Sequence, residues 1–127
     1  MTRDIAFCAY PSSNVAALRA WYETHLGLKF KGAYEEDGVE QYNEADVGSG
    51  CFAIMNHVWV RQPPGTGGGI AFAVDDLRAT LSALASAGIE SDEPHTTPVC
   101  TSTTVRDPEG NVFFLHQSTR QQEPAPP

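Results

Sequence analysis

Residues 105–115 read Val-Arg-Asp-Pro-Glu-Gly-Asn-Val-Phe-Phe-Leu, a tight turn between two short apolar segments. Pro108 fixes φ near the value that a turn requires, and Gly110 adopts a positive φ at no steric cost. The pattern therefore predicts a hairpin with strands over 99–106 and 111–117.

The first half of the chain carries the pattern of a strand, a helix and three further strands. Asn14 is a good helix N-cap, and apolar residues then recur at spacings of three and four up to Gly27, a typical helix-ending residue. We expect an amphipathic helix between these two residues. The expected strands span residues 4–10, 28–34, 39–46 and 51–58, with a turn at 35–38.

The second half repeats this pattern. Asn14 matches Asp76 at an offset of 62, and Gly27 matches Gly88 at an offset of 61. We expect a strand over 70–74 and then a helix that Asp75 or Asp76 caps. Such a repeat predicts two βαβββ modules in one chain.

The repeat defines the domain organisation. The modules span 4–61 and 69–117, joined by a connector at 62–68 that is rich in Pro and Gly. We expect a single α+β domain over 1–117, with curved mixed sheets that enclose a cleft. The Pro-rich tail over 118–127 is expected to be disordered.

Composition excludes several classes of function. The 127 residues suffice for one domain, and 41% of them are hydrophobic. The net charge of −8, with only 8 Lys and Arg, leaves little for a nucleic-acid-binding patch. No apolar run is long enough for a bilayer, and the N-terminus lacks a secretory signal pattern. We therefore expect neither a nucleic-acid nor a membrane partner.

The three cysteines, Cys8, Cys51 and Cys100, are far apart in the chain and form no Cys-x-x-Cys motif. This spacing argues against a disulfide framework and against a thiolate zinc site. Free thiols are typical of a reducing compartment, so we expect a cytoplasmic protein.

Three segments together resemble the vicinal oxygen chelate superfamily: residues 14–28, residues 70–77 with 87–89, and residues 105–115. This superfamily contains glyoxalase I, extradiol dioxygenases, fosfomycin-resistance enzymes and bleomycin-resistance proteins. The resemblance implies the glyoxalase-like fold of paired βαβββ modules and favours a homodimer. It does not by itself fix a reaction, because the superfamily includes metalloenzymes and metal-free binding proteins.

The resemblance also implies where a metal would bind, because metal enzymes of the superfamily use His, Gln or Glu on four equivalent strands. Carried over to this chain, those positions are Phe7, Gly69, Phe114 and a residue near Phe52 or Ile54. None of them offers an electron pair, and a divalent metal needs about three or more N, O or S ligands. We therefore expect no metal and no cofactor. A weaker alternative is a relocated metal site that joins His116 to His57, Glu40 and Glu44.

Alternation along the expected strands predicts a pocket instead of a metal site. Phe114 shares a face with His116, Phe7 shares one with Ala9, and Gly69 shares one with Ala71. An aromatic wall thus faces a wall of small residues, although a packed core that closes the pocket is the alternative. The expected ligand-binding residues are Phe7, Ala9, Tyr42, Phe52, Ile54, Trp59, Gly69, Ala71, Cys100, Phe114 and His116.

Two functions fit these observations. The first is a metal-free small-molecule binding protein that sequesters a planar neutral or cationic ligand, because the net negative charge draws cations and aromatic rings attract them. The alternative is a glyoxalase- or dioxygenase-related enzyme, a lyase or oxidoreductase, with a non-standard site at His116 as the candidate catalytic residue. A dimeric interaction module without a ligand is the weakest hypothesis.

Overall fold

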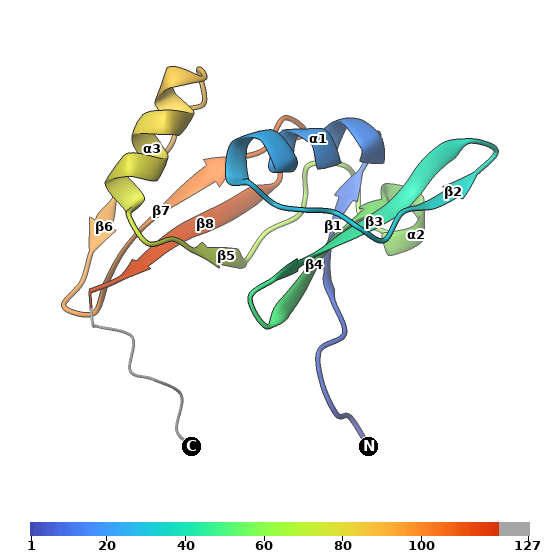
Figure 1. Ribbon diagram of the computed structural model, residues 1–127, viewed down its shortest axis with the longest axis horizontal. Coiled ribbons are helices and arrows are strands. Elements are labelled where there is room, and N and C mark those ends of the chain that lie inside the picture. The colour runs from blue at the N-terminus through green and yellow to red at the C-terminus, as the bar shows by residue number, and fades with distance from the viewer. Residues whose placement is uncertain (120–127) are drawn as a thin grey trace. The chain divides into compact units, whose positions relative to one another are not determined.

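The computed structural model describes residues 1–119 of the chain (Figure 1). The chain divides into two compact units: Met1–Gly68 with Asp107–Val112, and Gly69–Arg106 with the residues from Phe113 onward. Each unit contains a four-stranded mixed sheet, with strand orders β1-β4-β3-β2 and β5-β8-β7-β6. This architecture confirms the α+β fold of two modules. Asp107–Val112, although late in the sequence, belongs to the first unit.

The elements follow the two modules in order. The first module consists of β1 (Cys8–Ser12), α1 (Val15–Leu26), β2 (Tyr34–Glu36), β3 (Val39–Val47), β4 (Gly50–Asn56) and the single turn α2 (His57–Val60). The second consists of β5 (Ile70–Ala73), α3 (Leu77–Ser86), β6 (His95–Thr96), β7 (Cys100–Arg106) and β8 (Val112–Ser118). In both modules the first strand pairs in parallel with the last one. No helix among the described residues is both long enough and apolar enough to cross a bilayer.

Local capping sets the helix ends where the sequence predicts them. The Asn14 side chain accepts a hydrogen bond from the backbone N–H of Ala17 at 3.1 Å, and α1 ends at Gly27 with φ +67°. Asp76, not Asp75, caps α3 by accepting from the N–H of Ala79 at 3.1 Å. Both expected helices are therefore confirmed.

Two strand ends of the first module differ from the sequence expectations. β1 begins at Cys8 and continues through Pro11, which β1 tolerates because it is an edge strand of its sheet. β4 ends at Asn56, whose side chain accepts from the N–H of Val58 at 2.9 Å and starts α2.

Residues 28–34 and the tail differ as well. The segment expected as a strand contributes only an isolated bridge between Phe30 and Ala45, and β2 begins at Tyr34. At the other end of the chain β8 extends to Ser118, and the N–H of Thr119 donates to the carbonyl oxygen of Val99 at 2.9 Å. The rest of the expected disordered tail lies outside the described residues.

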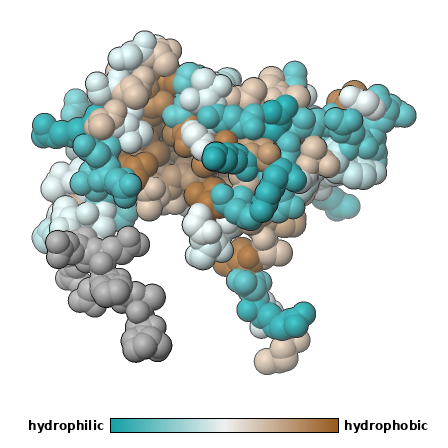
Figure 2. Space-filling model, in the orientation of Figure 1, coloured by the Kyte–Doolittle hydropathy of each residue, from teal (hydrophilic) through white to brown (hydrophobic). Residues whose placement is uncertain are grey.

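The first unit has its core between α1 and one face of its sheet. Phe52 and Ile54 of β4 are buried there, and the ring of Phe52 lies 5.1 Å from that of Tyr22 on α1. We call the opposite face of this sheet its open face. The tip of the hairpin between β2 and β3, which carries an acidic run at 35–37, is mostly hydrophilic (Figure 2).

The core of the second unit follows the same alternation. Phe72 of β5 and Phe113 and Leu115 of β8 are buried, and the rings of Phe72 and Phe113 lie 5.7 Å apart. Leu77 and Leu84 of α3 are also buried in this unit. The side chains that alternate with these, among them Ala71 and Ala73 of β5 and Phe114 and His116 of β8, therefore form the open face of the second sheet.

A buried polar network anchors the turn at 107–111 within the first unit. The Asp107 carboxylate accepts from the hydroxyl of Tyr22 and from the side-chain amide of Asn111, both at 2.8 Å. The Asn111 side-chain oxygen accepts from the N–H of Gly67 at 2.7 Å. Because every buried polar side-chain atom of the described residues has a partner, this network fixes the turn without an unsatisfied group.

Candidate ligand-binding faces

The open face of the second sheet carries an exposed aromatic ring beside two small residues. Ala71 pairs with Phe114 and Ala73 pairs with His116 across the parallel strands β5 and β8, so these four side chains share one face. Phe114 is 39% exposed, both alanines are exposed, and His116 is half-buried. Among the described residues no hydrogen-bond partner of the His116 imidazole is found. The predicted sharing of a face by Phe114 and His116 is confirmed, but Ala71 and Ala73 lie beside them on the same sheet and not on an opposing wall.

The open face of the first sheet is also aromatic. The ring of Phe7 contacts that of Tyr42 edge-on at a centroid distance of 5.7 Å. Ala9 pairs with Ala53, so a small residue lies on the same face. Trp59 lies on α2 rather than on a strand, is 42% exposed, and contacts the Tyr34 ring at 5.7 Å.

Phe52 and Ile54 correct the expected list of ligand-binding residues. Both lie on the face of β4 that α1 covers and are almost fully buried, so neither belongs to the open face. The register of the two parallel pairs explains the error. Ala9 in the first module corresponds to Ala71 in the second. Ala9 pairs with Ala53, and Ala71 pairs with Phe114, so Ala53 is the residue that corresponds to Phe114. The expectation was off by one residue, which reverses the face of a strand.

Gly69 and Cys100 differ in how well they suit a ligand site. Gly69 has φ +90°, a conformation that other residues rarely adopt, although no atom would obstruct an added Cβ. Cys100 is half-buried at the start of β7, and its sulfur lies 3.3 Å from the hydroxyl oxygen of Thr97. Alternation places Cys100 on the opposite face of β7 from the buried Val105.

The residues at the superfamily's metal positions do not fit a metal. In the first unit these positions hold Phe7 and Ala53, and in the second they hold Gly69 and Phe114. None of the four side chains has a nitrogen, oxygen or sulfur atom, so none can replace a ligand of the bound ion. Chemistry that depends on a metal at these positions therefore has no support in this chain.

The relocated metal site also lacks support from the first unit. His57 begins α2, and the Glu40 carboxylate already accepts hydrogen bonds from Arg19 at 2.9 Å and from Asn43 at 3.0 Å. No group of three His, Cys, Asp or Glu side chains that could hold a metal ion is found among residues 1–119.

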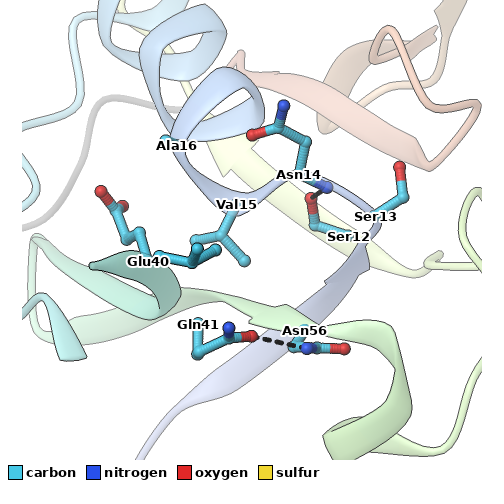
Figure 3. Close-up of a pocket in the computed structure, with 9 residues that line it drawn as sticks. Ser12, Ser13, Asn14, Val15, Ala16, Glu40, Gln41 and Asn56 are labelled. Atoms are coloured by element: carbon cyan, nitrogen blue, oxygen red, sulfur yellow. Dashed lines mark hydrogen bonds between the residues drawn. The ribbon is translucent and has the colours of Figure 1, made fainter. Parts of the chain in front are cut away.

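A polar pocket of about 280 Å³ opens at the N-terminus of α1 in the first unit (Figure 3). Its walls are residues 12–16 on one side and Gln41 and Asn56 on the other, with Val39 and Glu40 completing the lining. The Asn56 side-chain amide donates to Gln41 at 2.5 Å. Sequence reasoning missed this pocket, because Asn14 in its lining carried only a signal for helix capping.

Glu109 occupies the helix terminus beside that pocket. Its carboxylate accepts from the hydroxyl of Ser12 at 2.5 Å and from the N–H and hydroxyl of Ser13 at 2.6 and 2.5 Å. A helix N-terminus favours an anion, and here the anion is supplied by the chain's own turn. The pocket is therefore not arranged to receive an anionic ligand at this helix end.

Comparison with known proteins identifies the family. The family model described as "Glyoxalase/Bleomycin resistance protein/Dioxygenase superfamily" matches residues 4–115, and the chain belongs to this superfamily. A search of curated proteins finds no match.

Solved structures share the fold at low sequence identity. TnmS3, an antibiotic binding protein from Streptomyces sp. CB03234, is 20% identical with a TM-score of 0.79, over 93% of this chain and 98% of that one. A superfamily member from Sphaerobacter thermophilus is 19% identical with a TM-score of 0.77, over 91% and 98% of the chains. Lactoylglutathione lyase from Agrobacterium tumefaciens is 18% identical with a TM-score of 0.73, over 91% and 94%. At such identities the likeness establishes the fold alone.

Proposed function

We propose that this protein binds a planar small molecule, neutral or cationic, on the open faces of its sheets and does so without a metal. One observation carries the proposal: Phe114 is exposed beside Ala71 and Ala73, with the His116 imidazole on the same face. A ring above small residues suits the stacking of a flat ligand, and one imidazole can orient it by a hydrogen bond. The proposed contact residues are Phe7, Ala9, Tyr42, Trp59, Gly69, Ala71, Cys100, Phe114 and His116.

Three further observations support a binding protein over an enzyme. The superfamily's metal positions in this chain carry no donor atoms, so the superfamily's metal-dependent reactions lack their ligands. A protein of the same fold, TnmS3, is described as an antibiotic binding protein. The net charge of −8 favours cations and neutral molecules over anions such as thiol conjugates.

The test is a titration with acridine, which is planar and uncharged at neutral pH, with naphthoate as a planar anion. We expect acridine to bind and naphthoate not to bind. Phe114→Ala should weaken acridine binding roughly five- to ten-fold through lost stacking. Val99→Ala, which shortens another exposed side chain of the second unit, should leave it unchanged.

His116→Ala should weaken acridine binding by roughly 1 kcal/mol, the contribution of one hydrogen bond. Binding of naphthoate alone would contradict the proposal. Turnover of a hemithioacetal or a catechol would favour the enzyme.

We also propose that the protein acts as a homodimer in the cytoplasm. The superfamily resemblance supports the dimer, and three free cysteines support a reducing compartment. Light scattering coupled to gel filtration tests the dimer, and a monomer at micromolar concentration would contradict it.

A further inference from the structure

Glu44 is a carboxylate beside the aromatic residues on the open face of the first sheet. It lies on β3 two residues from Tyr42, and it pairs with the buried Ala53 of β4. Side chains two apart on a strand share a face, so Glu44 is beside the edge-on pair of Tyr42 and Phe7. The side chain of Glu44 is half-buried, which makes an unneutralised charge there more costly than one in open solvent.

Two contacts hold this carboxylate on the open face. The thiol of Cys51 donates to Glu44 Oε2 at 2.7 Å. Gly32 makes the second contact, because the Cβ of any larger residue at this position would lie 2.7 Å from Glu44 Cγ. The Glu44 side chain therefore occupies space that only glycine leaves free. Glu44 therefore has a defined position and not the freedom of a surface glutamate.

No cation in the described part of the chain forms an ion pair with Glu44. The nearby Lys31 ammonium is bound to Asp46 at 2.5 Å, so that pair neutralises itself. Burial, together with the charge of Glu44, raises the pKa of Tyr42 to about 12. Burial, the hydrogen bond to Glu44 and its charge likewise raise the pKa of Cys51 to about 11. Both neighbours therefore experience the negative charge.

We propose that Glu44 is the specificity-determining residue of the open face of the first sheet and that it pairs with a positive group on a planar ligand stacked there against Tyr42 and Phe7. This inference rests on the proposed function and narrows its ligand class to planar cations. A ligand cation would supply the counter-charge that the chain does not give Glu44, and an aromatic ring next to a carboxylate attracts the same group.

The experiment compares proflavine, a planar cation at neutral pH, with acridine, its uncharged relative. We expect the wild-type protein to bind proflavine more tightly than acridine, with a preference that falls as salt is added. Glu44→Gln keeps the shape and should reduce proflavine affinity roughly ten-fold, the loss expected for one hydrogen bond to a charged group. Acridine affinity should not change in this variant. Glu90→Gln, which removes the same charge from an exposed position in the second unit, is the matched control.

The outcomes separate this inference from the proposed function. Equal binding of both dyes by the wild type, or an equal loss for both dyes in Glu44→Gln, would overturn the role of Glu44 while leaving a planar-ligand site. An equal loss of proflavine binding in Glu90→Gln would also overturn it, because net charge alone would then explain the preference. Failure of both dyes to bind would contradict the proposed function itself.

Discussion

Tyr22→Phe is the sharpest test of how the turn at 107–111 holds the first unit together. The Tyr22 side chain is fully buried, and its hydroxyl donates to Asp107 Oδ2 at 2.8 Å. The substitution removes this one oxygen and keeps the ring, which lies 5.1 Å from the rings of both Trp21 and Phe52. The change in stability therefore reports the hydrogen bond and not the packing.

The magnitude follows from the charge and burial of Asp107. A hydrogen bond to a charged group contributes about 1.5–3 kcal/mol, so Tyr22→Phe should lower the free energy of unfolding by about 2 kcal/mol. For a chain of this length, that loss corresponds to a fall of roughly 5–10 °C in Tm. The remaining donors to Asp107, which are the Asn111 side chain and the backbone N–H groups of Glu109 and Asn111, stay in place.

The pH dependence of this loss has a defined sign. Burial raises the pKa of Asp107 above its ordinary value, and the hydrogen bond from Tyr22 opposes that rise. A carboxyl with a raised pKa in the folded state stabilises the fold below its unfolded pKa and loses that contribution as the pH rises through the folded pKa. Removing the Tyr22 donor raises the pKa further, so the penalty of Tyr22→Phe should be larger at neutral pH than in acid.

Urea unfolding followed by far-ultraviolet circular dichroism measures both effects. Tyr34→Phe is the matched control, because the Tyr34 side chain is exposed and its hydroxyl makes a long contact of 3.4 Å to Glu36. The control should change stability by less than about 0.5 kcal/mol. A cost for Tyr22→Phe no larger than that of Tyr34→Phe would refute the reasoning.

Four further outcomes are expected. Cys51 should react slowly with iodoacetamide below its raised pKa of about 11, and Glu44→Gln should speed the reaction. Peptide mass spectrometry over a pH series measures the rate in both proteins. Equal rates would contradict the hydrogen bond between Cys51 and Glu44. Ala71→Leu should leave the urea curve unchanged and weaken acridine binding, whereas undiminished binding would argue against a site on the open face of the second sheet. Gly65→Ala should destabilise the fold by about 2 kcal/mol or more, because φ is +81° and the new Cβ would lie 2.3 Å from the Glu109 carbonyl oxygen; a wild-type urea curve would contradict this. Elemental analysis of protein purified without chelators should find no stoichiometric metal, and a value near one metal per chain would revive a relocated site.

Features that depend on neighbouring residues could be predicted from the sequence. α1 begins after Asn14 and ends before Gly27, as expected, because a cap needs only a side chain and a backbone conformation within one helical turn. The two modules could also be predicted, since an offset of 62 between Asn14 and Asp76 repeats a pattern of local signals. The shared face of Phe114 and His116 follows from alternation along a single strand.

Features that depend on distant pairing could not be predicted in the same way. The role of Gly32 in making room for Glu44 has no sequence signal, because the two residues meet only when the chain pairs residue 30 with residue 45. The ion pair between Lys31 and Asp46, which engages a cation near Glu44, also joins residues that are distant in the sequence. Sequence reasoning assigned Glu44 only to the weaker alternative of a relocated metal site.

The sequence by itself determined the modules, the helix ends and the absence of donor side chains at Phe7, Gly69 and Phe114, because composition and local spacing contain all of that information. Only the tertiary structure decided which side of β4 faces the helix. Phe52 and Ile54 alternate with Ala53, so a shift of one residue in register would exchange the side chains that face α1 for those on the opposite face. Hydrogen bonds to β1 and β3 set that register, and no signal along β4 alone specifies it.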